Sequence, residues 1–244
     1  MTTTLDYDPK LYAALHQGTE GDLAFYVRAC EGARSVLELG CGYGRVAAHL
    51  AARGHAVTGI DNDEGLIAMS PAGFEVVRED MRSFSLATRF DRVIIPHSGI
   101  YCLLSEADAR DCLARAYEHL APEGRLVLDA YAADAFHDHA RPEDQDDDHL
   151  DPVGVVTVDE RNHDVFESSV WDRTTQRLTA SYLYIEQESG EAVTGVIEQR
   201  YLLREQIEAL LAEAGFVEVS VAGDFEEGPY DDDSDLLVVT AQRR

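Results

Sequence analysis

Residues 36–45 read Val-Leu-Glu-Leu-Gly-Cys-Gly-Tyr-Gly-Arg, and this stretch decides the fold. Val36, Leu37 and Leu39 predict a short apolar strand, after which a glycine turn leads into an apolar-periodic helix that ends near Gly54. A strand, a glycine turn and a helix in this order are typical of the phosphate- or nucleoside-binding start of an α/β fold. Glycine suits the turn because a side chain would hold the backbone away from a ligand.

The spacing of the glycines favours one class of ligand. The dinucleotide fingerprint is Gly-x-Gly-x-x-Gly, whereas here the third glycine comes one residue early and Arg45 takes the fingerprint position. Glu38 precedes the turn, where an acid would repel a pyrophosphate but suit a cationic ammonium or sulfonium. The stretch resembles motif I of the class I S-adenosylmethionine-dependent methyltransferases, acid-x-Gly-x-Gly-x-Gly. The resemblance implies that the following residues bind S-adenosyl-L-methionine: Glu38, Gly40, Cys41, Gly42 and Gly44.

The composition is that of an ordinary globular protein. The chain has 244 residues, of which 45% are hydrophobic, and this suits one α/β domain with an insertion. No apolar run approaches the roughly 18 residues of a membrane span, and residues 1–6 lack the features of a signal peptide, so a cytoplasmic protein is expected. The four cysteines show no Cys-x-x-Cys spacing, which favours reduced thiols over a metal site or a disulfide framework.

The charge balance argues against nucleic acid as a partner. The net charge is −27, from 20 basic and 47 acidic side chains, and Lys10 is the only lysine. A nucleic-acid binder needs a basic footprint, and the sequence shows no cluster of Lys and Arg. We therefore expect a small-molecule acceptor. The acidity also fits a salty or acidic habitat, and composition does not separate the two explanations.

Strands and helices alternate along the first half of the chain, which predicts a doubly wound parallel sheet. The expected strands there are residues 35–39, 56–60, 74–77, 90–95 and 125–128. Asp63–Met69 is expected to be a short helix, and Ser105 is expected to cap the helix that precedes the fifth strand and stops at Pro122–Gly124. After residue 200 the pattern returns with a helix at 206–214 and strands at 216–221 and 236–241.

A different pattern interrupts this alternation. Residues 134–152 are polar and acidic and predict a solvated loop. Four strand-like runs follow without a helix, at residues 155–158, 165–171, 178–185 and 193–202. The expected fold class is α/β: a doubly wound, seven-stranded Rossmann-like methyltransferase sheet with an inserted antiparallel β extension after strand five. The expected organisation is a single domain 1–244, with an N-terminal helical lid at 1–31, a core at 32–132 and 200–244, and inserted strands at 150–203.

Acids follow the second and third expected strands. Asp61 comes seventeen residues after Gly44, near the roughly twenty-residue spacing at which an acid reaches a ribose; Asn62 is expected beside it. An acid at this spacing suits NAD and S-adenosylmethionine equally, because both contain adenosine. The alternative role for Asp61 is that of a helix cap. The resemblance places Asp80 at the adenine amino group and Met81 against the ring, and a surface turn is the alternative there.

The fourth strand ends in Pro96-His97-Ser98-Gly99-Ile100-Tyr101, at the edge where ligands of open α/β sheets bind. The Asn/Asp-Pro-Pro-aromatic and Pro-Cys motifs of nucleic-acid methyltransferases are missing, which agrees with a small acceptor. Pro96 is expected beside the cofactor. His97 is the candidate base that takes a proton from an ammonium or hydroxyl acceptor; the alternative is that it only hydrogen-bonds the cofactor or the backbone.

Aromatic residues elsewhere are candidates for lining the site. Tyr12 and His16 are four apart and share a helix face. In similar small-molecule methyltransferases an N-terminal helix closes over the cofactor, so the resemblance implies that Tyr12 contacts the cofactor and His16 the acceptor. Tyr101, Tyr131 and Trp171 are further candidates for the acceptor pocket. No metal is expected, because the ends of strands four and five lack paired acids and an amide.

These expectations combine into one hypothesis. The chain is expected to be an S-adenosylmethionine-dependent methyltransferase that acts on N or O of a small molecule, with a homodimer through the inserted strands as one arrangement. The alternatives are a non-catalytic S-adenosylmethionine-binding protein and a nicotinamide-dependent oxidoreductase. The glycine spacing and Glu38 argue against the latter.

Overall fold

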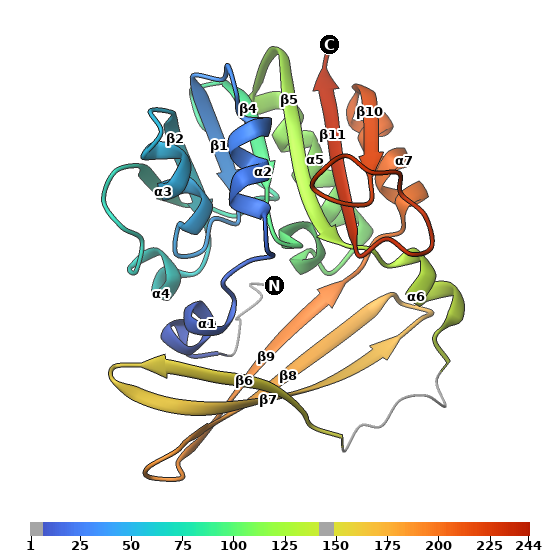
Figure 1. Ribbon diagram of the computed structural model, residues 1–244. Coiled ribbons are helices and arrows are strands. Elements are labelled where there is room, and N and C mark those ends of the chain that lie inside the picture. Colours follow the sequence, from blue (N-terminus) through green and yellow to red (C-terminus); the bar gives the residue numbers. More distant parts are fainter. Residues whose placement is uncertain (1–6, 142–148) are drawn as a thin grey trace. The chain divides into compact units, whose positions relative to one another are not determined.

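The chain separates into two compact units in the computed structural model, which describes residues 7–141 and 149–244 (Figure 1). The larger unit contains residues 18–138 and 202–244. The smaller unit contains the N-terminal segment up to Gln17 and residues 139–201. The N-terminal segment and the insertion, far apart in the sequence, thus form one unit.

A seven-stranded sheet forms the centre of the larger unit. Its strands are β1 (Ser35–Leu39), β2 (Ala56–Asp61), β3 (Glu75–Arg78), β4 (Phe90–Ile95), β5 (Leu120–Tyr131), β10 (Phe216–Ala222) and β11 (Leu236–Arg243). They lie in the order β10-β11-β5-β4-β1-β2-β3. The pairs from β3 to β5 are parallel, and β11 is antiparallel to both of its neighbours. The predicted α/β class with a seven-stranded, mostly parallel sheet is confirmed.

Helices cover both faces of this sheet. They are α2 (Asp22–Ala29), α3 (Arg45–Ala51), α4 (Glu64–Ile67), α5 (Glu106–His119), α6 (Asp134–His139) and α7 (Arg204–Ala214), with a 3₁₀ turn η1 at Gly99–Cys102. In Figure 1, α2 and α3 lie on one face and α5 and α7 on the other. Tyr26 of α2 and Leu50 of α3 are fully buried against Val36 and Ile94 of the central strands. Continuous apolar strands therefore follow from burial on both faces.

Three local expectations meet the structure differently. Ser105 caps α5 as predicted, its Oγ accepting the Asp108 N–H at 3.1 Å. Strand β5 begins at Leu120, five residues before its expected start, because Leu120 pairs with Phe90 before the ladder continues. The loop expected at 134–152 begins instead with α6, so that part of the prediction is wrong. Asp134 secures the start of α6, since its carboxylate accepts bonds from the Arg204 N–H and the Tyr230 hydroxyl. The acidic stretch of the expected loop, at 142–148, lies outside the described residues.

The smaller unit is a four-stranded antiparallel sheet with one helix. The helix is α1 (Pro9–Leu15), and the strands, in the order β6-β7-β8-β9, are β6 (Asp151–Val158), β7 (Arg161–Asp172), β8 (Arg177–Glu186) and β9 (Ala192–Arg200). Leu11 of α1 packs into a buried apolar cluster with Val156, Val165 and Tyr184. The four inserted antiparallel strands are confirmed. The division of the chain into one domain with a lid at 1–31 stays a prediction, since α1 belongs to one unit and α2 to the other.

Membrane-spanning helices are missing from the described parts of the chain, where no helix combines the necessary length and apolarity.

Candidate active site

The glycine turn between β1 and α3 has the backbone that the sequence requires. Gly40, Gly42 and Gly44 have φ angles of 68°, 53° and 80°, which favour glycine. A Cβ atom built on Gly44 would lie 2.3 Å from Cζ of Phe74, so the space there is also closed to a side chain. Cys41 is buried within the turn. The turn therefore presents backbone to any ligand at the carboxyl end of β1.

Asp61 at the end of β2 is bound directly to this turn. Its Oδ2 accepts the Gly42 N–H at 2.7 Å, and its Oδ1 accepts the Asp63 N–H at 2.8 Å. The alternative role of Asp61 as a helix cap is contradicted, because the side chain of Asp63 caps α4 by accepting the Leu66 N–H at 2.9 Å. The exposed Asn62 follows Asp61. An acid and the glycine turn thus meet as a ribose-binding site requires.

Glu38 lies at the other side of the turn and lacks a full set of partners. Its side chain belongs to a residue that is only 3% exposed, and among the described residues no group bonds its Oε2 atom. Burial raises the pKa of this carboxyl to about 8, although Arg45 and the Ala47 N–H act in the opposite direction. A buried polar atom without a partner is costly, and such atoms often mark a place where a ligand completes the bonding. Glu38 therefore fits a cationic ligand at the turn.

An ion pair that the sequence did not predict lies beside Glu38. Arg45, the first residue of α3, donates from Nη1 to Asp22 Oδ1 at 2.9 Å and from Nη2 to Asp22 Oδ2. Asp22 is only 2% exposed. A Cβ on Gly18 would lie 2.1 Å from Arg45 Nη2, so the chain at Gly18 packs closely against the pair. The unusual Arg45 after the glycines was visible in the sequence, but its partner was not.

The loop after β4 is held in an uncommon conformation. His97 and Ser98 have φ angles of 53° and 58°, in the left-handed region that non-glycine residues rarely adopt. Asp129 of β5 holds both residues: its Oδ1 accepts the His97 N–H at 3.0 Å, and its backbone oxygen accepts the Ser98 N–H at 2.9 Å. The buried Tyr26 hydroxyl donates to the same Oδ1 at 2.6 Å. Strained backbone held by buried contacts is common at functional sites.

His97 itself is available for chemistry. Its imidazole is partly buried and forms no hydrogen bond or ion pair in the described part of the chain. Burial lowers its pKa below the usual value, against the attraction of Asp129. The ring is therefore neutral near pH 7 and has a lone pair to accept a proton. The buried Pro96 precedes it at the end of the strand.

Met81 lies near the glycine turn, whereas Asp80 is already engaged. A Cβ on Gly40 would lie 3.9 Å from Met81 Cε, an ordinary contact distance. Arg82 binds the Asp80 carboxylate at 2.5 Å and Asp108 at 3.0 Å, and this lowers the pKa of Asp80. Contact of Asp80 and Met81 with adenine stays a prediction, and Arg82 is a neighbour that the sequence did not single out.

Tyr101 is a residue of the buried core. It is fully buried, and its hydroxyl lies 3.1 Å from the backbone oxygens of Tyr131 and Leu202. The prediction that Tyr101 contacts an acceptor is therefore wrong, because the side chain has no accessible surface and serves the core. Tyr131 packs edge-on against it, with 4.9 Å between ring centroids, and is partly exposed. Tyr131 remains a candidate for the acceptor side.

The remaining aromatic candidates belong to the smaller unit. The rings of Tyr12 and His16 are tilted by 36° with 4.3 Å between their centroids, and His16 meets Tyr182 of β8 edge-on at 5.2 Å. Trp171 lies in β7 opposite Leu178. The shared helix face of Tyr12 and His16 is confirmed. Their contacts with cofactor or acceptor, and that of Trp171, stay predictions.

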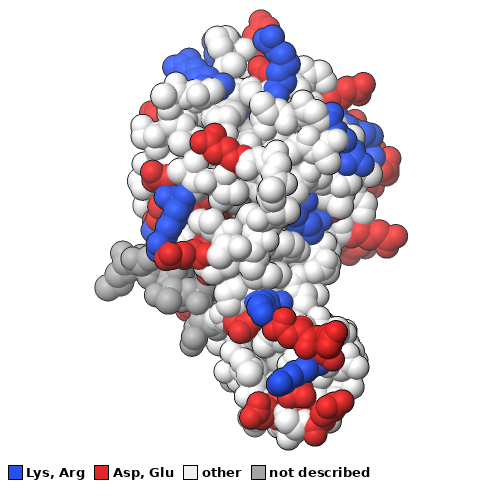
Figure 2. All heavy atoms as spheres, turned by 90° about the vertical axis from the view of Figure 1, so that its left-hand side faces the viewer, with Lys and Arg blue, Asp and Glu red and all other residues white. Residues whose placement is uncertain are grey.

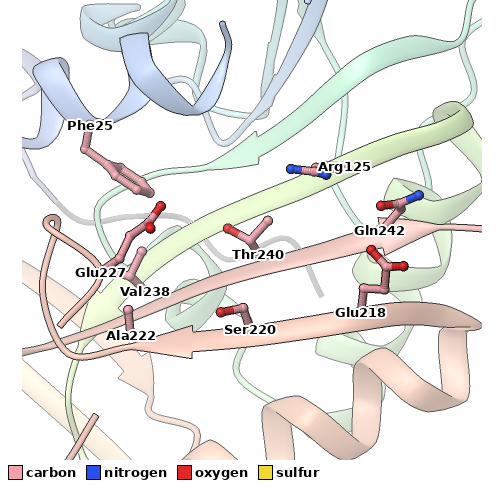
Figure 3. Close-up of a pocket in the computed structure, with 9 residues that line it drawn as sticks. All are labelled: Phe25, Arg125, Glu218, Ser220, Ala222, Glu227, Val238, Thr240 and Gln242. Carbon is pink, nitrogen blue, oxygen red and sulfur yellow. The ribbon is translucent and has the colours of Figure 1, made fainter. Parts of the chain in front are cut away.

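A hollow on the larger unit lies away from these residues (Figure 3). It is lined by Phe25, Arg125, Glu218, Ser220, Ala222, Glu227, Val238, Thr240 and Gln242. Gln242 pairs with Arg125 near the start of β5, whereas Leu236 pairs with Tyr131 at its end. The hollow therefore runs toward the amino end of β5, and ligands of open α/β sheets bind beyond the carboxyl ends.

The charged side chains on one face of the molecule are dispersed (Figure 2). On the face drawn in Figure 2, blue Lys and Arg side chains stand singly among red Asp and Glu, without a continuous basic stripe among the described residues. No group of three or more His, Cys, Asp or Glu within residues 7–141 and 149–244 could hold a metal ion. The candidate site consists of the glycine turn, the acids Glu38 and Asp61 on either side of it, and the loop after β4.

A glycine turn bonded to one acid and preceded by another, on a sheet of this strand order, is typical of nucleoside-binding sites in Rossmann-like folds. Residues 36–124 match a family model described as a methyltransferase domain. The match starts in β1 and ends in β5, so it contains Glu38, the glycine turn, Asp61 and His97. Residues 36–124 are therefore similar to a methyltransferase domain, in agreement with the resemblance seen in the sequence.

Individual methyltransferases are similar to the chain as well. The dTDP-3-amino-3,6-dideoxy-alpha-D-glucopyranose N,N-dimethyltransferase of Streptomyces fradiae is 31% identical over 133 residues, which cover 50% of this chain and 52% of that protein. The CcbJ methyltransferase of Streptomyces caelestis is 27% identical, with a TM-score of 0.74 over 93% of this chain and 97% of that one. The sugar N-methyltransferase KedS8 of a Streptoalloteichus species is 23% identical, with a TM-score of 0.74 over 100% and 96%, and supports the fold.

The curated relatives are matched over different lengths. The chain spans 44% of a Geobacillus protein named as a methyltransferase and 52% of the Streptomyces fradiae enzyme.

Proposed function

We propose that this protein transfers a methyl group from S-adenosyl-L-methionine to a small-molecule acceptor, with an amine nitrogen of a sugar as the preferred target over an oxygen. One observation carries the choice of cofactor: the buried Glu38 carboxyl has a partner-free oxygen where the glycine turn begins. An ammonium would complete the hydrogen bonding of this oxygen and favour the ionised carboxylate, which would repel a pyrophosphate. The names of the Streptomyces fradiae enzyme and of KedS8 support an amino sugar as acceptor.

The residues around the turn would bind the cofactor through separate parts. The backbone of Gly40–Gly44 admits the ligand closely because no side chain intervenes. Glu38 would accept hydrogen bonds from the ammonium of the methionine portion, and Asp61 would accept them from the ribose hydroxyls. The bound cofactor supplies an electrophilic methyl group on a sulfonium. Every other requirement of the reaction falls to the acceptor and to the protein.

His97 would prepare the acceptor. An ammonium cannot attack a methyl group until it has lost a proton and freed its lone pair. The imidazole is neutral and partner-free among the described residues, so it can take that proton. Asp129 fixes the backbone of the loop that presents His97, through the bond at 3.0 Å. A positioned base of this kind contributes about 10²- to 10⁴-fold in rate.

Calorimetric titration with S-adenosylhomocysteine, with NAD as control, tests the cofactor. We expect micromolar binding of the first ligand and no binding of NAD. Binding of NAD alone would refute the proposal in favour of an oxidoreductase. Binding of S-adenosylhomocysteine without methylation of any amine or hydroxyl acceptor would favour the non-catalytic alternative.

Substitution of His97 tests the chemistry. His97→Ala should lower turnover about 10²- to 10⁴-fold while the affinity for S-adenosylhomocysteine stays within a few-fold. His49→Ala is the matched control, because His49 lies on α3 and is not assigned to the site. Retained turnover of His97→Ala across the pH range would remove His97 from the mechanism.

Two broader features belong to the same proposal. A homodimer through β6–β9 is proposed from the resemblance, and sedimentation or light scattering of the purified protein would test it. A cytoplasmic location is proposed from the sequence, and fractionation of the source cells would test it.

A further inference from the structure

The groups around Glu38 contain more acid than base. Its Oε2 has no partner among the described residues, and the Ala47 N–H is the backbone group that favours its ionised form. The titratable and charged side chains that interact with it come from two helices, one strand and the glycine turn: Arg45 of α3, Asp61 of β2, Asp22 and Tyr26 of α2, Cys30 at the end of α2, and Cys41 of the turn. Its partner in the neighbouring strand β4 is the apolar Ile94. Arg45 is the one cation in this set.

Arg45 is committed to a different carboxylate. It forms two hydrogen bonds with Asp22, and both side chains are largely inaccessible, with 16% and 3% exposure. The two charges therefore neutralise each other. Asp61 has its own compensation, because it accepts N–H groups from Gly42 and Asp63. Among the described residues of this set, Glu38 is therefore the buried carboxyl without a counter-ion of its own.

A buried carboxylate without a counter-ion is unfavourable, and such a group avoids the cost by taking up a proton. Bringing an ammonium next to it reverses the preference, since an opposite charge at short distance favours the ionised form. The protonation state of Glu38 should therefore change when a cationic ligand enters the turn.

On the basis of the proposed function, we propose that Glu38 is a carboxylic acid in the cofactor-free protein and releases its proton to solvent when the ammonium of the cofactor binds, and that Asp22 sets up this coupling by holding Arg45. The O–H bond of the acid is lost, and the carboxylate then accepts hydrogen bonds from the ammonium. Asp22 is a positioning residue in this scheme, because it acts on Glu38 only through Arg45.

The size of the effect follows from the pKa of Glu38, which burial raises to about 8. At pH 7 about nine molecules in ten would carry the proton, so binding would release about 0.9 proton per cofactor. The affinity would also rise nearly tenfold between pH 6 and pH 7, because the proton competes with the ammonium.

Calorimetry in several buffers of different ionisation enthalpy at pH 7 measures the proton release directly. We expect about 0.9 proton per S-adenosylhomocysteine in the unmodified protein. Methylthioadenosine, which shares the adenosine and thioether but has no ammonium, should release close to none. These readouts do not depend on methyl transfer.

Three variants identify the source of the proton. Glu38→Gln should abolish the release, since an amide does not titrate. Asp22→Asn should reduce it, because Arg45 becomes free to pair with Glu38 and ionise it before the ligand arrives. Asp111→Asn is the matched control, an exposed acid on α5 that should leave the release unchanged. Circular dichroism checks the folding of each variant.

The outcomes separate this inference from the proposed function. Binding of S-adenosylhomocysteine without proton release, or with full release in Glu38→Gln, would overturn the coupling and leave the cofactor assignment standing. Full release in Asp22→Asn would overturn the role of Asp22. Failure of the unmodified protein to bind S-adenosylhomocysteine would refute the proposed function, and the coupling with it.

Discussion

Replacing Tyr26 by phenylalanine removes one hydroxyl group from the interior of the larger unit. This hydroxyl donates a 2.6 Å hydrogen bond to Asp129 Oδ1, and the two residues are 0% and 2% exposed. Burial and the neighbouring carboxylate raise the pKa of Tyr26 well above its usual value, so the hydroxyl remains a donor at any ordinary pH. Tyr26→Phe therefore takes one of two donors from a buried carboxyl and leaves the His97 N–H as the other.

The expected cost can be worked out from the type of bond. A hydrogen bond to a charged group contributes about 1.5–3 kcal/mol, and water cannot replace the lost donor in a closed site. We expect a loss of about 2 kcal/mol in the free energy of unfolding of the larger unit. For chains of about 150–250 residues this corresponds to a fall of about 4–8 °C in Tm.

The assay is urea denaturation monitored by far-UV circular dichroism, together with hydrogen exchange. The denaturation midpoint should fall with an unchanged m-value, and the amides of His97 and Ser98 should exchange faster because Asp129 holds them less firmly. Tyr117→Phe is the control, because among the described residues its hydroxyl forms no hydrogen bond and the change should stay within about 0.5 kcal/mol. Equal stability of the two variants would refute the reasoning.

Three further predictions concern other parts of the chain. Gly44→Ala should lower the free energy of unfolding by about 1–3 kcal/mol and weaken cofactor binding, because the new Cβ atom would overlap Phe74. Gly54→Ala is the control, because Gly54 also has a positive φ of 95° but a Cβ atom there would have no neighbour within 4 Å, and calorimetry should find its cofactor binding unchanged. The pKa of Glu38 is raised from 4.5 to about 8, so its contribution to stability is complete below pH 4.5 and is lost as the pH rises through 8. The test is the difference in unfolding free energy between the unmodified protein and Glu38→Gln. As the pH rises from 4.5 to 8, this difference should fall by up to about 1.4 kcal/mol per pH unit, and a difference that does not change with pH would contradict the prediction. Leu11→Ala should cost about 2–5 kcal/mol in the smaller unit, which is measurable as faster amide exchange in β6–β8 with the larger unit unaffected.

The parts of the fold that the sequence predicted depend on local patterns. The apolar residues 93–95 of β4 are buried because both faces of the strand are covered, and the bounds of that strand, Phe90–Ile95, were predicted without error. Ser105 is placed as a cap by the acid three residues later, and the observed bond follows that spacing. The glycine turn was predicted for the same reason, since its φ angles admit few other residues.

The parts that the sequence did not predict depend on contacts between distant residues. Asp22 and Arg45 are 23 positions apart, and Tyr26 and Asp129 are 103 apart, so no local pattern joins them. Tyr101 was expected at the ligand edge because it follows β4, but the 3₁₀ turn that contains it directs the ring into the core. The end of a strand indicates where a loop lies, not which way its side chains point.

The packing of the N-terminal segment against the inserted strands has a consequence for the design of chimeric proteins. Because Leu11 completes the apolar cluster of β6–β8, the first segment of the chain and the insertion after β5 behave as one cassette encoded in two pieces. A chimera that imports a foreign insertion but retains the native start would juxtapose unrelated surfaces and leave Val156 and Val165 poorly covered. Grafting of the insertion from one protein onto another should therefore transfer residues 7–17 together with it.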